Sequence, residues 1–206
     1  MLFPSSSRTF LFIAGLPVFA GAPVQGIENF YKVGEHVYRG AQPTDAGFNY
    51  LAKIGIKMVI DLREHDERSI AEQRTVTASG MQYVNVPMTG LTPPTEAEIS
   101  KILALLEDET SGPVFVHCKQ GVDRTGAVIA AYRIDHDRWD NARALSEAKS
   151  AGIHIFQKPR KDWIQKFHPL TEEAKGIAKP SEADGVKTTA IATDAAQNSA
   201  PVDSNR

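Results

Sequence analysis

The feature that most constrains how this chain folds is the ten-residue segment HCKQGVDRTG at residues 117–126, which we call the signature loop. An apolar run, Val114–Val116, comes directly before it, and apolar residues at helical spacing follow it from Ala127 to Tyr132. This order of patterns predicts a buried strand, a tight turn and the start of a helix. The signature loop is therefore expected at the carboxyl end of a strand, where open α/β sheets bind their ligands.

The residues of the signature loop suit the binding of an oxyanion. The backbone N–H groups of residues 119–124 can curl inward as an anion-binding nest in front of the helix that follows. Gly121 supplies the backbone freedom that such a curl needs. The planar guanidinium of Arg124 can bind two oxygens of one phosphoryl group at once, which a lysine cannot do.

Cys118 is placed to act as a nucleophile. The thiolate is the reactive form of cysteine, and a helix N-terminus or a nearby cation lowers the pKa of a thiol. The signature loop supplies both, so we expect the sulfur of Cys118 to be ionised near neutral pH. The alternative is an ordinary buried thiol, which would suit a cysteine without these neighbours.

The ten residues resemble the His-Cys-x5-Arg-Thr-Gly signature of the cysteine-based protein tyrosine and dual-specificity phosphatases, with every fixed position filled. The resemblance implies that Cys118 attacks phosphorus to form a cysteinyl-phosphate and that Arg124 binds the substrate and stabilises the transition state. Water then completes the reaction without a metal, and His117 supports the thiolate. Thr125 can offer its hydroxyl to the departing sulfur. Substrate contacts are expected from Lys119, Gln120, Gly121, Val122, Thr125 and Arg63.

The chain departs from the family in the loop at residues 87–94, where many relatives carry the aspartate that protonates the leaving group and this sequence has no acid. Such an acid contributes a rate factor of ~10²–10⁴. Asp123 is the first candidate, because the myotubularins and some bacterial phosphatases have a proposed acid at this position before the arginine. The alternative is that Asp123 accepts hydrogen bonds that orient Arg124 or cap the next helix. Asp66 and Asp61 are weaker candidates.

The resemblance extends upstream of the signature loop. Residues 38–43, YRGAQP, are similar to the opening strand and turn of bacterial and atypical dual-specificity phosphatases. The apolar run at 57–62 is typical of a central parallel strand buried on both faces, and Asp61–Arg63 resembles a strand-end motif of these enzymes. Arg63 is then expected on the rim of the site, where it steers an anion while Asp61 supports it. The alternative is an ion pair, between Asp61 or a neighbouring acid and a basic residue, that fixes the loop.

The remaining patterns predict a single α/β domain with a mostly parallel central sheet flanked by helices. Thr44 is a helix cap, and Thr95 with Glu98 forms a capping box for a helix with one apolar face. Residues 67–79 are expected to form a polar, mostly exposed helix. The other expected elements are a strand at 36–39, a strand at 83–86, a helix from Asp140 or Asn141 to Gly152, and a helix or extended arm at 153–168.

Length and composition bound the function. A chain of 206 residues suits one domain of ordinary size, which we place at residues 26–170. The net charge of −2 gives no global attraction to nucleic acid, so an anionic substrate must be attracted by the signature loop itself. The single cysteine excludes an internal disulfide, and the six histidines lack the spacing of a zinc site. We expect no metal, no cofactor, no nucleic-acid partner and a monomer.

Both ends of the chain differ from the domain. Residues 1–20 contain an apolar core of signal-peptide length, too short to span a bilayer comfortably, with small residues at a cleavage position. We expect cleavage there, a periplasmic or secreted protein and no stable membrane insertion. The alternative is an apolar N-terminal helix packed on the domain. Residues 176–206 have almost no large apolar side chain, which predicts a disordered tail.

Several functions are compatible with this sequence. The first is a protein tyrosine or dual-specificity phosphatase that acts on a phosphorylated protein or a small-molecule phosphate ester. Lys119, exposed in the signature loop together with Gln120, would instead favour a polyanion such as an inositol phosphate or a phosphoinositide. A rhodanese-like sulfurtransferase also carries a cysteine in a cradle loop, but His117 and residues 124–126 favour phosphate. A non-catalytic module that binds phosphorylated ligands would lack the nucleophile or the arginine, and both are present.

Overall fold

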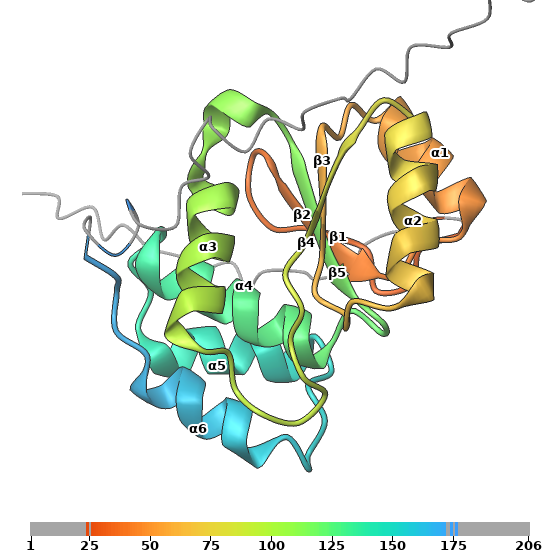
Figure 1. Ribbon diagram of the computed structural model, residues 1–206. Helices are drawn as coiled ribbons and strands as arrows, with labels where there is room; N and C mark the ends of the chain where they lie inside the picture. The colour runs from red at the N-terminus through yellow and green to blue at the C-terminus, as the bar shows by residue number, and fades with distance from the viewer. Residues whose placement is uncertain (1–23, 25, 172–173, 175, 177–206) are drawn as a thin grey trace, which may run out of the picture.

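Five strands form the sheet at the centre of the fold (Figure 1). They are β1 (Tyr31–Lys32), β2 (Val37–Ala41), β3 (Met58–Asp61), β4 (Gln82–Asn85) and β5 (Val114–Cys118). The computed structural model describes residue 24, residues 26–171, and residues 174 and 176. The expected signal segment at 1–20 lies outside the described residues, as does the expected tail at 176–206 apart from residue 176.

The described part of the chain has six α-helices and one short 3-10 turn. They are α1 (Asp45–Lys53), α2 (Glu67–Ala78), α3 (Glu96–Glu107), α4 (Asp123–Asp135), α5 (Asn141–Ser150), α6 (Lys158–Lys166) and η1 (Glu109–Ser111). In Figure 1, α1 and α2 cover one face of the sheet, and α3 to α6 lie on the other side. None of the described helices is both long and apolar enough to cross a membrane.

The strand order is β1-β2-β5-β3-β4, and every neighbouring pair is parallel except β1 with β2. Cys118, the last residue of β5, lies opposite Ala41 of β2, and His117 lies opposite Asp61 of β3. The parallel strands therefore end at one edge of the sheet, and the signature loop leaves the sheet at that edge. This arrangement confirms the predicted α/β domain with a mostly parallel sheet.

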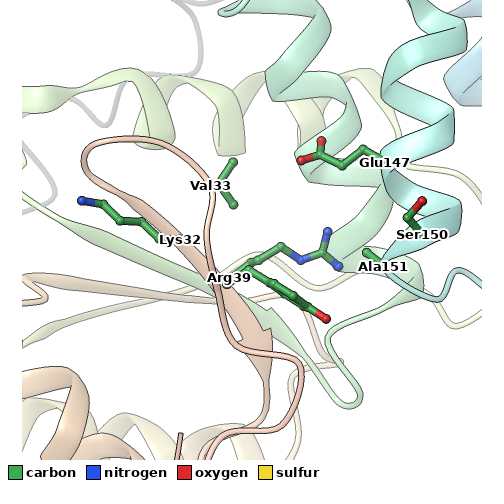
Figure 2. A pocket seen from close by; sticks show the side chains of 7 residues that line it. Lys32, Val33, Arg39, Glu147, Ser150 and Ala151 are labelled. Carbon is green, nitrogen blue, oxygen red and sulfur yellow. The ribbon is translucent and has the colours of Figure 1, made fainter. Parts of the chain in front are cut away.

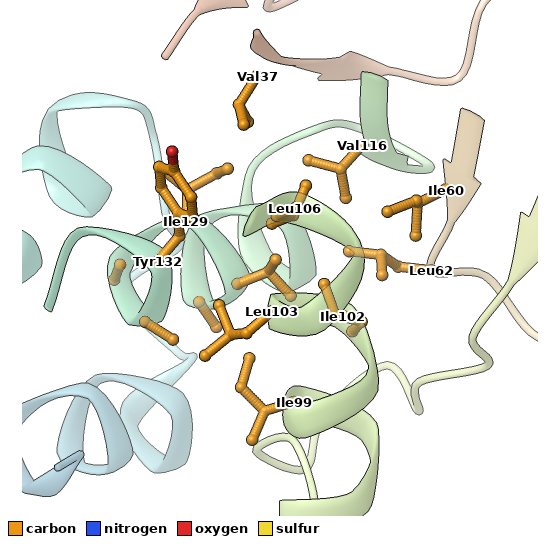
Figure 3. Packing of buried hydrophobic residues seen from close by; sticks show 14 of the residues in the cluster. Val37, Ile60, Leu62, Ile99, Ile102, Leu103, Leu106, Val116, Ile129 and Tyr132 are labelled. Carbon is orange, nitrogen blue, oxygen red and sulfur yellow. The ribbon is translucent and has the colours of Figure 1, made fainter. Parts of the chain in front are cut away.

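Alternate residues of β5 enter two separate hydrophobic clusters, because successive side chains of a strand point to opposite faces. Val114 and Val116 belong to the larger cluster, which also holds apolar side chains of α3 and α4 such as Ile129 (Figure 3). Phe115 belongs to the other cluster, with Phe48 of α1. Full burial of an apolar side chain of this size stabilises a fold by about 1.5–3 kcal/mol. A strand used on both faces explains the continuous apolar run in the sequence.

Side chains at three helix starts confirm the predicted boundaries. The hydroxyl of Thr44 caps α1. Thr95 and Glu98 form the expected capping box of α3, in which each side chain accepts a hydrogen bond from the backbone N–H of the other residue. Of the two candidate caps for α5, Asp140 is the one used. These local signals fix where the helices begin before any tertiary contact is considered.

Three segments differ from the expectations. The helix after the signature loop begins at Asp123, before the apolar pattern, so the last residues of the signature loop form its first turn. The helix expected to be mostly exposed, α2, buries Glu72 to 5% exposure. The segment 153–168 forms a turn followed by α6 rather than one helix or arm. Each difference places polar residues next to the signature loop.

Candidate active site

Cys118 lies at the carboxyl end of β5 and is almost fully buried. Burial alone would raise the pKa of its thiol. Hydrogen bonds from the hydroxyl and backbone N–H of Thr125, the charge of Arg124 and a hydrogen bond from the N–H of Gly121 outweigh burial and lower this pKa below its ordinary value. The geometry therefore favours the thiolate, as expected for a nucleophile.

A pocket of about 240 Å³ lies over the signature loop. Its lining contains Cys118, Lys119, Gln120, Asp123 and Arg124, all of them predicted site residues, together with Gly90, Leu91, Phe156 and Gln157. Gly121, Val122 and Thr125 do not line it, and the side chains of Val122 and Thr125 are buried. The side chain of Thr125 contacts the sulfur instead. Substrate binding by the backbone N–H groups of Gly121 and Val122 stays a prediction.

Arg124 is held at the ends of two strands. Its Nη1 donates to the carbonyl oxygen of Leu62 at 3.3 Å and to that of Met88 at 3.2 Å. Leu62 follows β3, and Met88 lies beyond β4, so the sheet edge orients the guanidinium. One nitrogen accounts for both contacts, and the guanidinium lines the pocket. Arg124 is thus fixed in place next to Cys118 with donors available to an oxyanion.

Gly121 is required by a close approach between the signature loop and β2. Its φ is +71°, and a Cβ atom there would lie 2.3 Å from the carbonyl carbon of Gly40. Arg39, also on β2, donates from Nη2 to the carbonyl oxygen of Gly121 at 2.6 Å. Figure 2 shows this buried guanidinium pointing toward α5, on the side where Glu147 lies. Arg39 therefore supports the signature loop from behind and does not line the pocket that lies over it.

The expectation that Arg63 steers an anion is wrong. Its Nη2 lies 2.6 Å from Asp61 Oδ2 and 2.6 Å from Glu72 Oε2, and Arg63 is 7% exposed and absent from the pocket lining. The alternative, an ion pair that fixes the loop, is the arrangement found. Asp61 also accepts from the hydroxyl of Tyr83 at 2.8 Å and is fully buried. Asp61 therefore supports this ion pair and cannot act as the leaving-group acid.

His117 belongs to the same cluster of charged side chains as Arg63 and Glu72. Its Nε2 lies 2.7 Å from Glu72 Oε1, and both side chains are buried. Burial alone would lower the pKa of His117, but the hydrogen bond and the charge of Glu72, with the charge of Asp61, raise the pKa above its ordinary value. The side chains of Asp61, Glu72 and His117 are close enough together to hold a cation. The guanidinium of Arg63 already pairs with both carboxylates, so it serves as that cation.

Asp123 contacts residues that the sequence analysis did not connect with the site. Its Oδ1 accepts a hydrogen bond from the backbone N–H of His154 at 2.9 Å, and His154 Nδ1 lies 2.9 Å from each carboxylate oxygen. Gln157 Nε2 donates to Oδ2 at 3.4 Å. The carboxylate thus bonds to the turn before α6, and neither expected alternative, a helix cap or a direct bond to Arg124, describes these contacts.

The loop at 87–94 forms part of the pocket wall although it carries no acid. Arg160 is fully buried and donates to the carbonyl oxygens of Thr89 at 2.5 Å and Gly90 at 2.7 Å. Its Nη1 also donates to Gln157 Oε1 at 2.6 Å. The turn and α6 therefore hold this loop in place, and their polar residues recur every third position: His154, Gln157 and Arg160. That spacing was the available sequence signal.

Asp66, the other weak acid candidate, has a structural role. It caps α2 by accepting hydrogen bonds from the backbone N–H groups of Arg68 and Ser69. Its carboxylate also pairs with the guanidinium of Arg68 at 2.5 Å. Asp66 is absent from the pocket lining, so it is not placed to protonate a leaving group. Among the acids considered from the sequence, Asp123 alone lines the pocket.

Comparisons with known proteins match most of this chain. A family model described as a DSP-PTPase phosphatase fused to NAD+ kinase matches residues 25–166. The chain is 33% identical over 126 residues to the dual specificity protein phosphatase TpbA of Pseudomonas aeruginosa, covering 61% of this chain and 55% of that protein. It is 26% identical over 128 residues to the probable chloroplastic NAD kinase 2 of Oryza sativa subsp. japonica, covering 60% of this chain and 13% of that one.

Solved structures share the fold. The crystal structure of P. aeruginosa TpbA matches with a TM-score of 0.60 and 22% identity, covering 74% of this chain and 96% of that chain. The core catalytic domain of the PP-IP phosphatase Siw14 from S. cerevisiae, in complex with citrate, matches with a TM-score of 0.63 and 23% identity, covering 76% and 94%. Since the chain spans about half the length of the curated TpbA sequence, these matches concern the domain described above.

Proposed function

This chain belongs to the DSP-PTPase phosphatase family, and from that membership we propose that it hydrolyses phosphate monoesters through a cysteinyl-phosphate on Cys118, without a metal. One observation carries the proposal: a thiol whose pKa is lowered by Thr125 and Arg124 lies in a pocket at the start of a helix. The N-terminus of α4 and the guanidinium of Arg124 provide the positive potential that a phosphoryl group needs.

The proposed reaction has two steps. The sulfur of Cys118 attacks phosphorus, the bond between phosphorus and the ester oxygen breaks, and the leaving oxygen takes a proton from Asp123. Water then attacks phosphorus, the sulfur–phosphorus bond breaks, and the proton returns to Asp123 as phosphate is released. Arg124 binds the phosphoryl oxygens in both steps, and Thr125 donates its hydrogen bond to the sulfur when it leaves.

An aromatic phosphate, such as phosphotyrosine in a protein, is the substrate class that the pocket mouth favours. In the part of the chain that the structure describes, the large exposed apolar side chains are Ile70, Leu91, Ile155 and Phe156. Leu91 and Phe156 line the pocket and are 66% and 63% exposed. Exposed apolar groups beside a binding site offer contact area to an apolar part of the ligand. A TpbA variant has also been crystallised in complex with phosphotyrosine.

An inositol phosphate is the second candidate, because one observation favours it. Lys119 is exposed and lines the pocket next to Gln120, which adds a cation for a substrate with several phosphates. Siw14, one of the structural neighbours, is named a PP-IP phosphatase. The two candidate substrates depend on different side chains at the pocket mouth. Phe156→Ala should raise KM for a phosphotyrosine peptide, and Lys119→Ala should raise KM for an inositol polyphosphate.

Two further features of the protein belong to the same proposal. We infer that the protein is exported after cleavage near residue 20 and acts in the periplasm or outside the cell, as a monomer, on a phosphorylated protein or small molecule. Sequencing the N-terminus of the mature protein tests export, because an intact Met1 would contradict it. Light scattering of the purified protein gives the oligomeric state.

The catalytic proposal is tested with Cys118→Ser and p-nitrophenyl phosphate. The variant should have no turnover above background and should still bind vanadate or phosphate, while the wild type should be inhibited by vanadate and unaffected by a chelator. Wild-type protein quenched in acid during turnover should carry one phosphoryl group on Cys118 in its mass spectrum. Turnover that survives in Cys118→Ser, or that a chelator abolishes, contradicts the proposal.

A further inference from the structure

We propose that His154 is a positioning residue that holds Asp123 in the pocket and stores the proton that Asp123 delivers to the leaving group. This inference rests on the proposed phosphatase function. It gives a role to a histidine that the signature sequence does not include. It also accounts for the missing acid in the loop at 87–94, because the proton then comes from Asp123 in the signature loop.

Asp123 contacts both the backbone and the side chain of His154. Asp123 opens α4, and His154 lies in the turn between α5 and α6. The carboxylate accepts from the backbone N–H of His154 at 2.9 Å, which fixes the main chain of the turn. It also lies 2.9 Å from Nδ1 through both oxygens. An ionised carboxylate only accepts hydrogen bonds, so Nδ1 must carry the hydrogen.

This arrangement determines what each nitrogen of His154 can do. With its hydrogen directed at Asp123, Nδ1 is the atom through which a proton can pass to the carboxylate. In the imidazolium both nitrogens carry a hydrogen, and after Nδ1 has given its hydrogen to Asp123 the neutral ring keeps the one on Nε2. The ring is not deeply buried, since the side chain is 36% exposed. The ring is therefore in contact with solvent.

Several charged and titratable groups surround this pair. Asp123 lines the pocket together with Cys118, Lys119 and Arg124 of the signature loop, and its charge interacts with Arg160 of α6. His154 stacks on Phe156 with 5.0 Å between ring centroids. Lys161 of α6 also reaches this turn, where its Nζ donates to the carbonyl oxygen of Ile155 at 2.7 Å. Within the described residues, Asp123 is the acid with which the imidazole pairs.

Asp123 and His154 together supply the proton that the reaction needs and recover it by the end of the cycle. In the first step Asp123 gives a proton to the leaving oxygen and takes one from Nδ1 of the imidazolium, which becomes neutral imidazole. In the second step water loses a proton as its oxygen bonds to phosphorus, and that proton passes through Asp123 back to His154. The ester and water enter, the alcohol and phosphate leave, and His154 returns to its charged form.

A merely structural role makes a different prediction from proton storage. An anchor for the carboxylate needs only a hydrogen-bond donor at the position of Nδ1, which the side-chain amide of asparagine can supply. Proton storage needs a group that ionises, which asparagine cannot supply. His154→Asn therefore separates the two roles, and His154→Ala removes both. His168→Asn, at an exposed histidine after α6, is the matched control.

The experiment measures kcat and KM of these variants from pH 5 to 9 on two esters that differ in leaving group. On phenyl phosphate, a poor leaving group, His154→Asn should lower kcat by about 10- to 100-fold and leave KM within about twofold, because general acid catalysis contributes ~10²–10⁴. On p-nitrophenyl phosphate the loss should be about threefold or less. The dependence of kcat on pH with phenyl phosphate should differ between the wild type and His154→Asn, because the amide of asparagine does not ionise.

Two results would overturn the inference. If His154→Asn matches the wild type on phenyl phosphate at every pH, His154 only anchors Asp123. If it loses the same factor on both esters, the residue maintains the pocket and stores no proton. Both results differ from failure of the phosphatase proposal itself, which would appear as turnover in Cys118→Ser. Because His154→Asn keeps the donor to Asp123, the comparison holds even if His154→Ala does not fold.

Discussion

The imidazole Nε2 of His117 lies 2.7 Å from Oε1 of Glu72, and both side chains are buried. The pair joins α2 to the end of β5, next to the nucleophile, because Nδ1 of the same ring lies 3.2 Å from the carbonyl oxygen of Cys118. The raised pKa of His117 means that its surroundings favour the charged form of this imidazole inside the protein. A buried charge of this kind is tolerated only with its counter-charge in place.

Glu72→Gln should destabilise the protein by about 3–5 kcal/mol, because it removes the nearer of the two carboxylates that face the buried His117. His117 has a raised pKa in the folded state, so its stabilisation is fully present below the pKa of an unfolded histidine, about 6.5. It is lost as pH rises through the folded pKa. Urea unfolding should therefore show a larger difference between variant and wild type at pH 6 than at pH 9. Glu67→Gln, at an exposed position of α2, is the control, and an equal effect of both substitutions would contradict the prediction.

Thr125→Val should shift the reactivity of Cys118 to higher pH. The valine keeps the shape of the side chain but removes the hydroxyl that helps to lower the pKa of the thiol. Without this hydroxyl one of the interactions that favour the thiolate over the thiol is lost, so the pKa of Cys118 should rise. The rate of alkylation by iodoacetamide, measured against pH, should rise later in the variant than in the wild type. Thr125→Ser keeps the hydroxyl and should follow the wild type. A profile that does not move in Thr125→Val would remove Thr125 from the activation of Cys118.

Gly121→Ala separates a steric clash from backbone strain when it is compared with Gly55→Ala. Both glycines have positive φ, +71° and +88°, so an alanine costs about 1–2 kcal/mol at either site. The space around Gly55 is open, whereas a Cβ at Gly121 would lie 2.3 Å from Gly40. Gly121→Ala should therefore lower the melting temperature further and also weaken vanadate binding, because the signature loop must move away from β2. Equal melting temperatures for the two variants would show that the loop adjusts without cost.

Much of this fold and part of the site were predictable because their causes are local in sequence. The caps at Thr44 and Thr95 act within one helical turn, and Cys118 and Arg124 lie in one loop whose spacing already specifies an anion site. The apolar run at 114–116 also correctly predicted that the strand, β5, is buried. In each case the residues that determine the structure lie within a few positions of one another.

The parts that sequence reasoning missed depend on contacts between distant segments. Glu72 belongs to a helix without a clear apolar face, so nothing in its neighbourhood predicts that it pairs with His117. Arg63 could equally well have faced solvent or the interior, and the buried carboxylates of Asp61 and Glu72 together hold it inside. His154 follows Asp123 by 31 residues. The segment that carries it resembles a packing arm, because its aromatic residues dominate the pattern.

Arg160→Met tests whether the turn and α6 control the pocket wall. The substitution keeps an unbranched apolar side chain in place of the fully buried arginine and removes its donors to the carbonyl oxygens of Thr89 and Gly90. The carbonyl oxygen of Gly90 keeps a hydrogen bond from Gln157 Nε2 at 3.2 Å, but that of Thr89 loses the donor it has here. A carbonyl left without a partner costs about 1–3 kcal/mol unless the loop at 87–94 moves out to water. That movement displaces Leu91 from the pocket, so KM for a phosphotyrosine peptide should rise by about tenfold.

The alkylation rate of Cys118 should stay near that of the wild type, since the hydrogen bonds to the sulfur come from the signature loop. Lys158→Met, at an exposed position of the same helix, should change neither quantity. If Arg160→Met alters the alkylation rate as strongly as KM, the arginine acts on the nucleophile rather than on the wall, and the loop at 87–94 does not control substrate binding.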